Sequence, residues 1–352
     1  MIENISAMLG ALLPAPVAQP VVKSFGKEKS FPEMSAGAPI KRNEAYFEVR
    51  LNQMCLANNV KWFSVYDPLV VITVGFDYGG KSIEVPAVLG PGIIQKHLDS
   101  GAPQFGTVLS DLKVIGPHPY RGSGISISIS FYRVERMNYT RSLLKVIERL
   151  SGIIGMGQIA TLASTGGALL DGLEGLLGGG ATVCMAAYKF NLPPPNYPLQ
   201  TGYTALIVPP VPDNLDTLLV RDSRLLQKEG GEERPFAGSD FVLISVAGMQ
   251  RRENEQFFSA YDLKEQALSI ISEGEASRKR AKAIMLSAFQ QLRGSDDFTK
   301  LEADLLFEEW LQEFDKEVSR YSRANAMPIR HNQPELALAA NDLNQAMDRL
   351  SL

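Results

Sequence analysis

Cysteine and histidine are both scarce in this chain of 352 residues, which holds two cysteines and three histidines. Two cysteines do not make a disulfide framework, so we expect a reducing compartment, the cytoplasm. The histidines, His97, His118 and His331, are scattered and lack the spacing with a cysteine that a zinc site needs. We therefore expect neither a metal nor a cofactor.

Basic residues are missing from the N-terminus, where the first one is Lys23. A secretory signal normally has a basic region before its apolar core, so we expect no signal peptide here. The prolines between residues 14 and 39 instead predict an arm or linker over residues 1–42. The net charge of −4 argues against general nucleic-acid binding, and we expect no nucleic-acid partner.

Charge of either sign is absent from residues 150–170, and no basic residue stands between Arg149 and Lys189. Ten of the 30 glycines fall between residues 150 and 188. The apolar run is long enough to cross a bilayer, but Gln158, the glycines and the missing aromatic or basic flank argue against a permanent span. We expect a buried or assembly-forming helical insert, with triggered membrane insertion as the alternative.

Small residues share one side of this insert at helical spacing, which would let another helix or strand approach closely. The candidate interaction or insertion residues are Gly152, Gly155, Gly157, Ala160, Ser164, Gly167, Leu169 and Leu170.

Strand-like sequence flanks the insert on both sides. Residues 124–134 alternate between apolar residues and serines, the period of a half-buried antiparallel strand. We divide the chain into an arm (1–42), a first β-rich block (43–137), a helix with the glycine-rich insert (138–181), a second β-rich block (182–250), a helical bundle (251–326) and a tail (327–352). The predicted class is α+β, with an antiparallel β-sandwich-like body in two sequence blocks. Whether the blocks form one sandwich or two domains stays open.

The C-terminal third is amphipathic at helical spacing. A basic run over residues 278–282 precedes a helix rich in acidic residues, which predicts an antiparallel helical hairpin. A further amphipathic helix is predicted over residues 335–350. Its candidate interaction residues are Leu336, Leu343, Met347 and Leu350.

The segment Gly75–Ser82 matches the phosphate-loop pattern G-x-x-x-x-G-K-[ST]. Such a loop requires a helix that starts at its Gly-Lys pair, and Pro86 would fall in the second turn of that helix. Apolar residues alternate on both sides of Gly79-Gly80, which favours a β-hairpin instead.

The sequence contains no credible catalytic constellation. We therefore expect a non-enzymatic interaction or assembly protein, which uses the insert and the C-terminal helices to bind a protein partner or further copies of itself. The alternative is a membrane-perturbing, pore-forming-type effector that deploys residues 150–187 on a trigger. A third hypothesis is a hydrolase in which Cys55 or Cys184 meets His118 in space.

Overall fold

The computed structural model of the chain describes residues 16–31, 37–57, 60–61, 64–90, 107–135, 182–193, 197–252 and 258–325. Contacts divide the chain into two units. A β-rich unit runs up to Arg42 and again from Tyr46 to Met249, and a helical unit runs from Gln250 onward and includes Asn43–Ala45.

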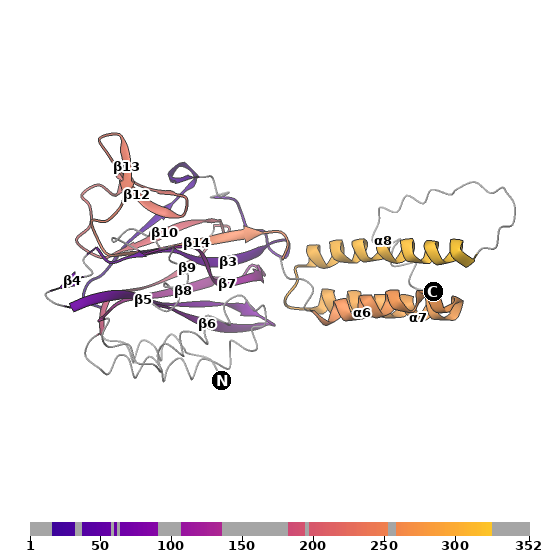
Figure 1. Ribbon diagram of the computed structural model, residues 1–352. Helices are drawn as coiled ribbons and strands as arrows, with labels where there is room; N and C mark the ends of the chain where they lie inside the picture. Colours follow the sequence, from indigo (N-terminus) through magenta and orange to yellow (C-terminus); the bar gives the residue numbers. More distant parts are fainter. Residues whose placement is uncertain are drawn as a thin grey trace. The chain divides into compact units, whose positions relative to one another are not determined.

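Figure 1 labels most of the strands of the β-rich unit. Their bounds are β1 Val21–Phe25, β2 Ser30–Phe31, β3 Tyr46–Cys55, β4 Val60–Lys61, β5 Ser64–Tyr78, β6 Lys81–Leu89, β7 Thr107–Pro119, β8 Ile125–Glu135, β9 Thr182–Leu192, β10 Gly202–Ile207, β11 Leu218–Arg221, β12 Arg224–Glu229, β13 Glu232–Pro235 and β14 Phe241–Met249.

Two five-stranded antiparallel sheets form most of this unit. The first sheet has the strand order β1-β10-β14-β3-β7. In the second, β4, β5, β8 and β9 follow in that order, and β6 also pairs with β5. The strands β3 and β8 precede the insert in sequence, whereas their partners β14 and β9 follow it. Strands from both sequence blocks therefore share both sheets and belong to one unit.

A cluster of rings joins the two sheets. Phe47 of β3 and Phe76 of β5 meet edge to face, with ring centroids 5.5 Å apart. The imidazole of His118, on β7, stacks on Phe76 with centroids 4.8 Å apart. All three side chains are buried, and removing such rings from water is a main source of folding free energy. Side chains of the two sheets thus share a core at this place.

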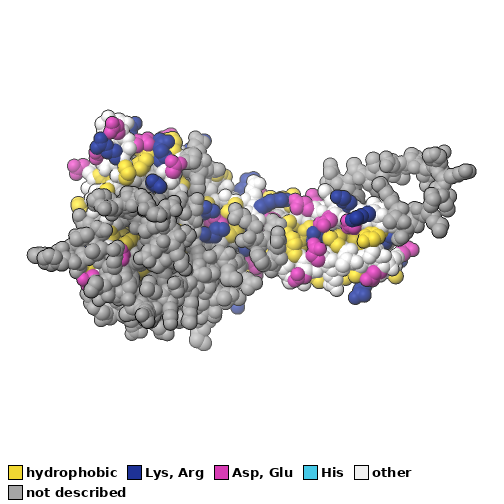
Figure 2. Space-filling view, viewed as in Figure 1, with side chains coloured by type: hydrophobic (Ala, Val, Ile, Leu, Met, Phe, Trp, Pro, Cys, Tyr) yellow, Lys and Arg dark blue, Asp and Glu magenta, His cyan; other side chains and the backbone are white. Residues whose placement is uncertain are grey.

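A smaller sheet, of order β13-β12-β11-β2, packs on the first one. Leu218 and Leu225 lie in one buried cluster with Phe241 of β14. The side-chain oxygen of Gln53, on β3, accepts a hydrogen bond from the backbone N–H of Leu225 at 2.7 Å. Figure 2 shows basic and acidic side chains mixed over β12 and β13, where Arg234 pairs with Glu232.

The hairpin interpretation of Gly75–Ser82 is confirmed. The strands β5 and β6 pair throughout this segment, and Gly79 and Gly80 form the turn between them with φ of +59° and +71°. Glycine adopts such angles without the strain that a side chain would add. Because Lys81 begins a strand, the helix that a phosphate loop requires does not form there. The alternation predicted along β8 is also present, with every second residue buried over most of the strand.

Three helices make up the described part of the helical unit: α6 (Ser259–Ser269), α7 (Glu275–Gly294) and α8 (Lys300–Asn325). The helices α7 and α8 run antiparallel, because Arg278 donates to Ser322 at one end and Arg293 lies 3.8 Å from Asp304 at the other. The stacked rings of Phe289 and Phe307 lie in the core between the helices.

The predicted α+β class is confirmed by these sheets and helices. In the described part of the chain, no helix combines the length and the apolar composition needed to cross a bilayer.

Candidate interaction site at the β8–β9 edge

The strands β8 and β9 pair along their whole length, with Ile125 opposite Leu192 at one end and Val134 opposite Thr182 at the other. The chain leaves β8 at Glu135 and re-enters the sheet at Thr182, the first residue of β9. The described pairs of β8 with β9 therefore join the chain on the two sides of residues 136–181. The glycine-rich insert lies in the sequence between these two paired strands.

The strand β9 is an edge strand, because no further strand pairs with it among the residues that the structure describes. Val183 and Tyr188 on β9 are 39% and 40% exposed, unusually high for large apolar side chains in this unit. The only charged residue of the strand is Lys189. An exposed edge with apolar side chains and little charge is a template for pairing with another chain.

The N-terminal arm reaches this edge. The backbone N–H of Val17 donates to the carbonyl oxygen of Cys184 at 2.9 Å. The side chain of Val17 is 68% exposed, so little apolar burial holds the arm there. Only a few residues further on, Val21 begins β1 at the edge of the first sheet. The arm thus passes from the edge of one sheet to the edge of the other.

A partly buried ion pair lies near the end of β8. Arg133, near the end of β8, donates to the carboxylate of Asp240 at 3.1 Å. The other carboxylate oxygen of Asp240 accepts from the backbone N–H of Ala57 at 2.7 Å. The Arg133 guanidinium also lies 5.7 Å from the centre of the Tyr66 ring. Because Asp240 directly precedes β14, these contacts tie the end of β8 to the first sheet.

Neither cysteine is an exposed nucleophile. Burial raises the pKa of the Cys184 thiol to about 11, and burial with the nearby charge of Asp240 raises the pKa of Cys55 to about 12. The thiolate is the reactive form of cysteine, so both thiols stay protonated at neutral pH. His118 stacks in the ring cluster of the core. These environments give no support to the hypothesis of a cysteine hydrolase.

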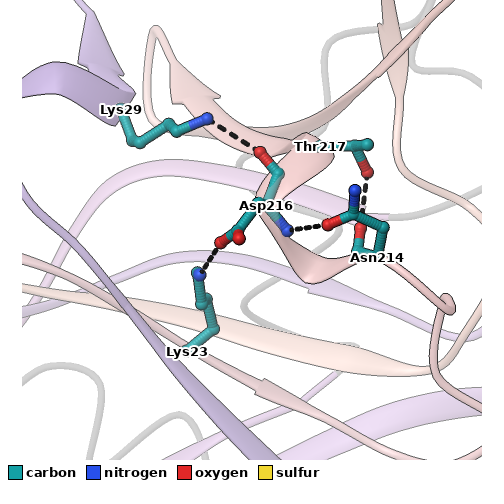
Figure 3. A network of polar contacts seen from close by, with 5 residues as sticks. All are labelled: Lys23, Lys29, Asn214, Asp216 and Thr217. Carbon is teal, nitrogen blue, oxygen red and sulfur yellow. Dashed lines mark hydrogen bonds and ion pairs between the residues drawn. The ribbon is translucent and has the colours of Figure 1, made fainter.

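A polar network fixes the segment that follows the arm (Figure 3). The carboxylate of Asp216 accepts from Lys23 of β1 at 2.7 Å, and its backbone oxygen accepts from Lys29, also at 2.7 Å. The pKa of Asp216 is held below its ordinary value, chiefly by the hydrogen bond from Lys23. Asn214 caps the same turn by accepting from the backbone N–H of Asp216. The chain is therefore fastened from β1 onward.

The residues predicted from the sequence to form the interaction surfaces lie outside the described residues. They are Gly152, Gly155, Gly157, Ala160, Ser164, Gly167, Leu169 and Leu170 of the insert, and Leu336, Leu343, Met347 and Leu350 of the tail. Sequence reasoning missed the contact of Val17 with Cys184. It joins two backbone groups, so no residue type marks it.

The described residues include no group of three or more histidine, cysteine, aspartate or glutamate side chains that could hold a metal ion. Comparison with models of known protein families gives no match to this chain, and neither does comparison with the curated proteins.

Proposed function

We propose that this protein is a non-enzymatic interaction and assembly protein, and that the glycine-rich insert is its main contact surface. The observation that supports the proposal is the pairing of β8 with β9 across the base of the insert. The strand pairs that the structure describes join residues on both sides of 136–181, and we take the two five-stranded sheets as the layers of one sandwich-like body. The glycine-dense insert between β8 and β9, of which residues 150–170 carry no charge, is in this proposal the segment that binds a partner, most simply a second copy.

The helical unit supplies a second apolar surface. Leu301 and Leu305, one turn apart on α8, are 40% and 37% exposed. Figure 2 shows hydrophobic side chains lying among charged ones on the visible face of this unit. In the proposal, these helices and the predicted tail helix over residues 335–350 add contacts to an assembly that the insert starts. The two buried free thiols suit a reducing compartment such as the cytoplasm.

Bulky substitutions on the small side of the insert test the proposal. We expect the full chain to associate as its concentration rises, measured by sedimentation velocity. Gly157→Leu combined with Ala160→Leu should weaken that association at least tenfold, because a small-residue side permits close approach only while it stays small. Leu162→Ile is the control and should leave association unchanged, because at helical spacing Leu162 lies opposite the small side. A full chain that stays monomeric at high concentration and binds no partner contradicts the proposal.

The same geometry favours one second candidate, a membrane-perturbing effector. The deployed segment predicted from the sequence, residues 150–187, includes residues 182–187, which belong to β9 and pair with β8. In this candidate only the part before Thr182 leaves the body, and every described strand pair stays intact. Vesicles loaded with a self-quenching dye test this candidate, with and without limited proteolysis of the protein. Dye release under one of these conditions supports it, and no release under any of them rejects it.

A further inference from the structure

We infer that the arm at Val17 is a displaceable guard on the outer edge of β9, and that the partner this edge fits is β9 of a second copy of the chain. The inference rests on the proposed function in that the protein self-assembles. It adds a second contact surface and a control on its use.

The described part of the arm is held weakly on β9, whereas the chain that follows the arm is held firmly in the first sheet. Among the described arm residues, the contact with β9 is the hydrogen bond from the Val17 N–H to the Cys184 oxygen. Behind the arm, β1 pairs with β10 over five residues, and Lys23 is bound to Asp216. For the described arm residues, loss of this hydrogen bond would release Val17 from β9 and leave the pairs of β1 with β10 intact. Pro16 and Pro20 lack backbone N–H donors, so the arm is poorly suited to extend a strand ladder itself.

The edge is suited to a copy of itself. It belongs to a strand of 11 residues with one charge, Lys189. In a two-fold antiparallel pairing centred on Ala187, Lys189 stands opposite Met185, so the two like charges are not opposed. The exposed side chain of Tyr188 stands opposite Ala186, a small neighbour. A long edge strand without blocking charges forms such ladders readily.

Val17→Pro in the full chain tests the guard, because proline removes the N–H donor at a position where the flanking sequence is already rich in proline. Val17→Ala is the matched control, because it keeps the donor and removes only an exposed side chain. A backbone hydrogen bond contributes about 1 kcal/mol, which corresponds to about fivefold in an equilibrium constant. We expect the dimerisation constant of Val17→Pro to rise about fivefold over the parent, and that of Val17→Ala to equal the parent.

A cross-link identifies the surface. Ala187→Cys, added to Val17→Pro, should yield dimers linked between the two introduced cysteines by a short bismaleimide, because position 187 faces its own copy in this register and Cys55 and Cys184 are buried. Val183→Lys, added to Val17→Pro, should return association to the parental level by placing charge on the edge. Links that map elsewhere, or equal behaviour of Val17→Pro and Val17→Ala, overturn the inference.

The same variants in a chain without residues 136–181 separate this inference from the proposed function. If Val17→Pro still promotes dimers there, the edge pairing is real and independent of the insert. If removal of the insert abolishes association while Val17→Pro changes nothing, the proposed function stands, and the inference that the arm blocks pairing at β9 is wrong.

Discussion

Arg252 is the residue on which the start of the helical unit depends most. Its side chain is buried, its guanidinium donates to the backbone oxygen of Asp297 at 2.6 Å, and it lies 5.0 Å from the centre of the Phe258 ring. Its backbone N–H donates to the buried carboxylate of Glu302. The preceding residue, Arg251, forms an ion pair with Glu309 at the surface, where both side chains are about half exposed.

These neighbouring arginines give a matched pair of substitutions. Arg252→Ala should lower the free energy of unfolding of the helical unit by about 3 kcal/mol, because it leaves buried polar partners without their cation. Arg251→Ala should change it by no more than about 0.5 kcal/mol, because exposed ion pairs contribute little. Urea unfolding followed by circular dichroism at 222 nm measures both. Equal losses in the two variants contradict this account of Arg252.

The buried thiols predict a pH dependence. Burial raises their pKa values from an ordinary value of 9.0 to about 11 for Cys184 and about 12 for Cys55. The unfolded chain therefore releases these protons first as the pH rises. Their contribution to stability is complete below pH 9 and is lost between pH 9 and about 12, with a slope of about 1.4 kcal/mol per pH unit for each thiol.

Denaturant unfolding at pH 8, 9 and 10 measures that slope, and it should be shallower in a variant with Cys55→Ala and Cys184→Ala. Iodoacetamide at pH 8.5 should label the native protein slowly and the unfolded chain at both thiols. Rapid labelling of the native protein would refute the burial argument.

At the scale of elements, β3 and β7 approach each other closely at Gly116. Its φ is +105°, and a Cβ built there would lie 2.6 Å from the carbonyl oxygen of Phe47 and 2.9 Å from the Cα of Glu48. Glu48 is itself buried and pairs with Lys113 at 2.6 Å. This part of the first sheet therefore has no room for a side chain at position 116.

Gly116→Ala should destabilise the β-rich unit by about 2–4 kcal/mol through backbone strain and the clash with β3. Gly26→Ala is the control, because its φ is −81° and a Cβ there meets no atom within 4 Å. Thermal unfolding followed by circular dichroism at 218 nm compares them. A tolerated Gly116→Ala would mean that β3 and β7 can separate at no cost.

The alternation of apolar and polar residues and the glycines at turns made several elements predictable from the sequence. The alternation of Ile125, Ile127 and Ile129 with serines marked β8, and Gly79-Gly80 marked the turn between β5 and β6. Pairing between distant strands was not predictable, because the register of β14 on β3 depends on contacts far apart in sequence. The edge of β9 could not be foreseen for the same reason, since nothing local distinguishes an edge strand from a central one.

Over the whole chain, one β-rich unit includes the strands on both sides of the glycine-rich insert. The strand pairs β8–β9 and β14–β3 join sequence from both sides of the insert. In the proposed function assembly depends on the insert, and in the further inference the arm at Val17 controls the edge of β9.

Excision of the insert tests this division most directly. A chain in which Asn-Gly joins Val134 to Thr182, its partner in the strand pair, keeps β8 and β9 in a two-residue hairpin. Its free energy of unfolding should be at least as large as that of the parent chain, because a short loop costs less entropy to close. Sedimentation velocity of the excised and parent chains over a range of concentrations is the decisive measurement. The account predicts a folded excised chain that stays monomeric where the parent associates, and equal association of the two chains would contradict it.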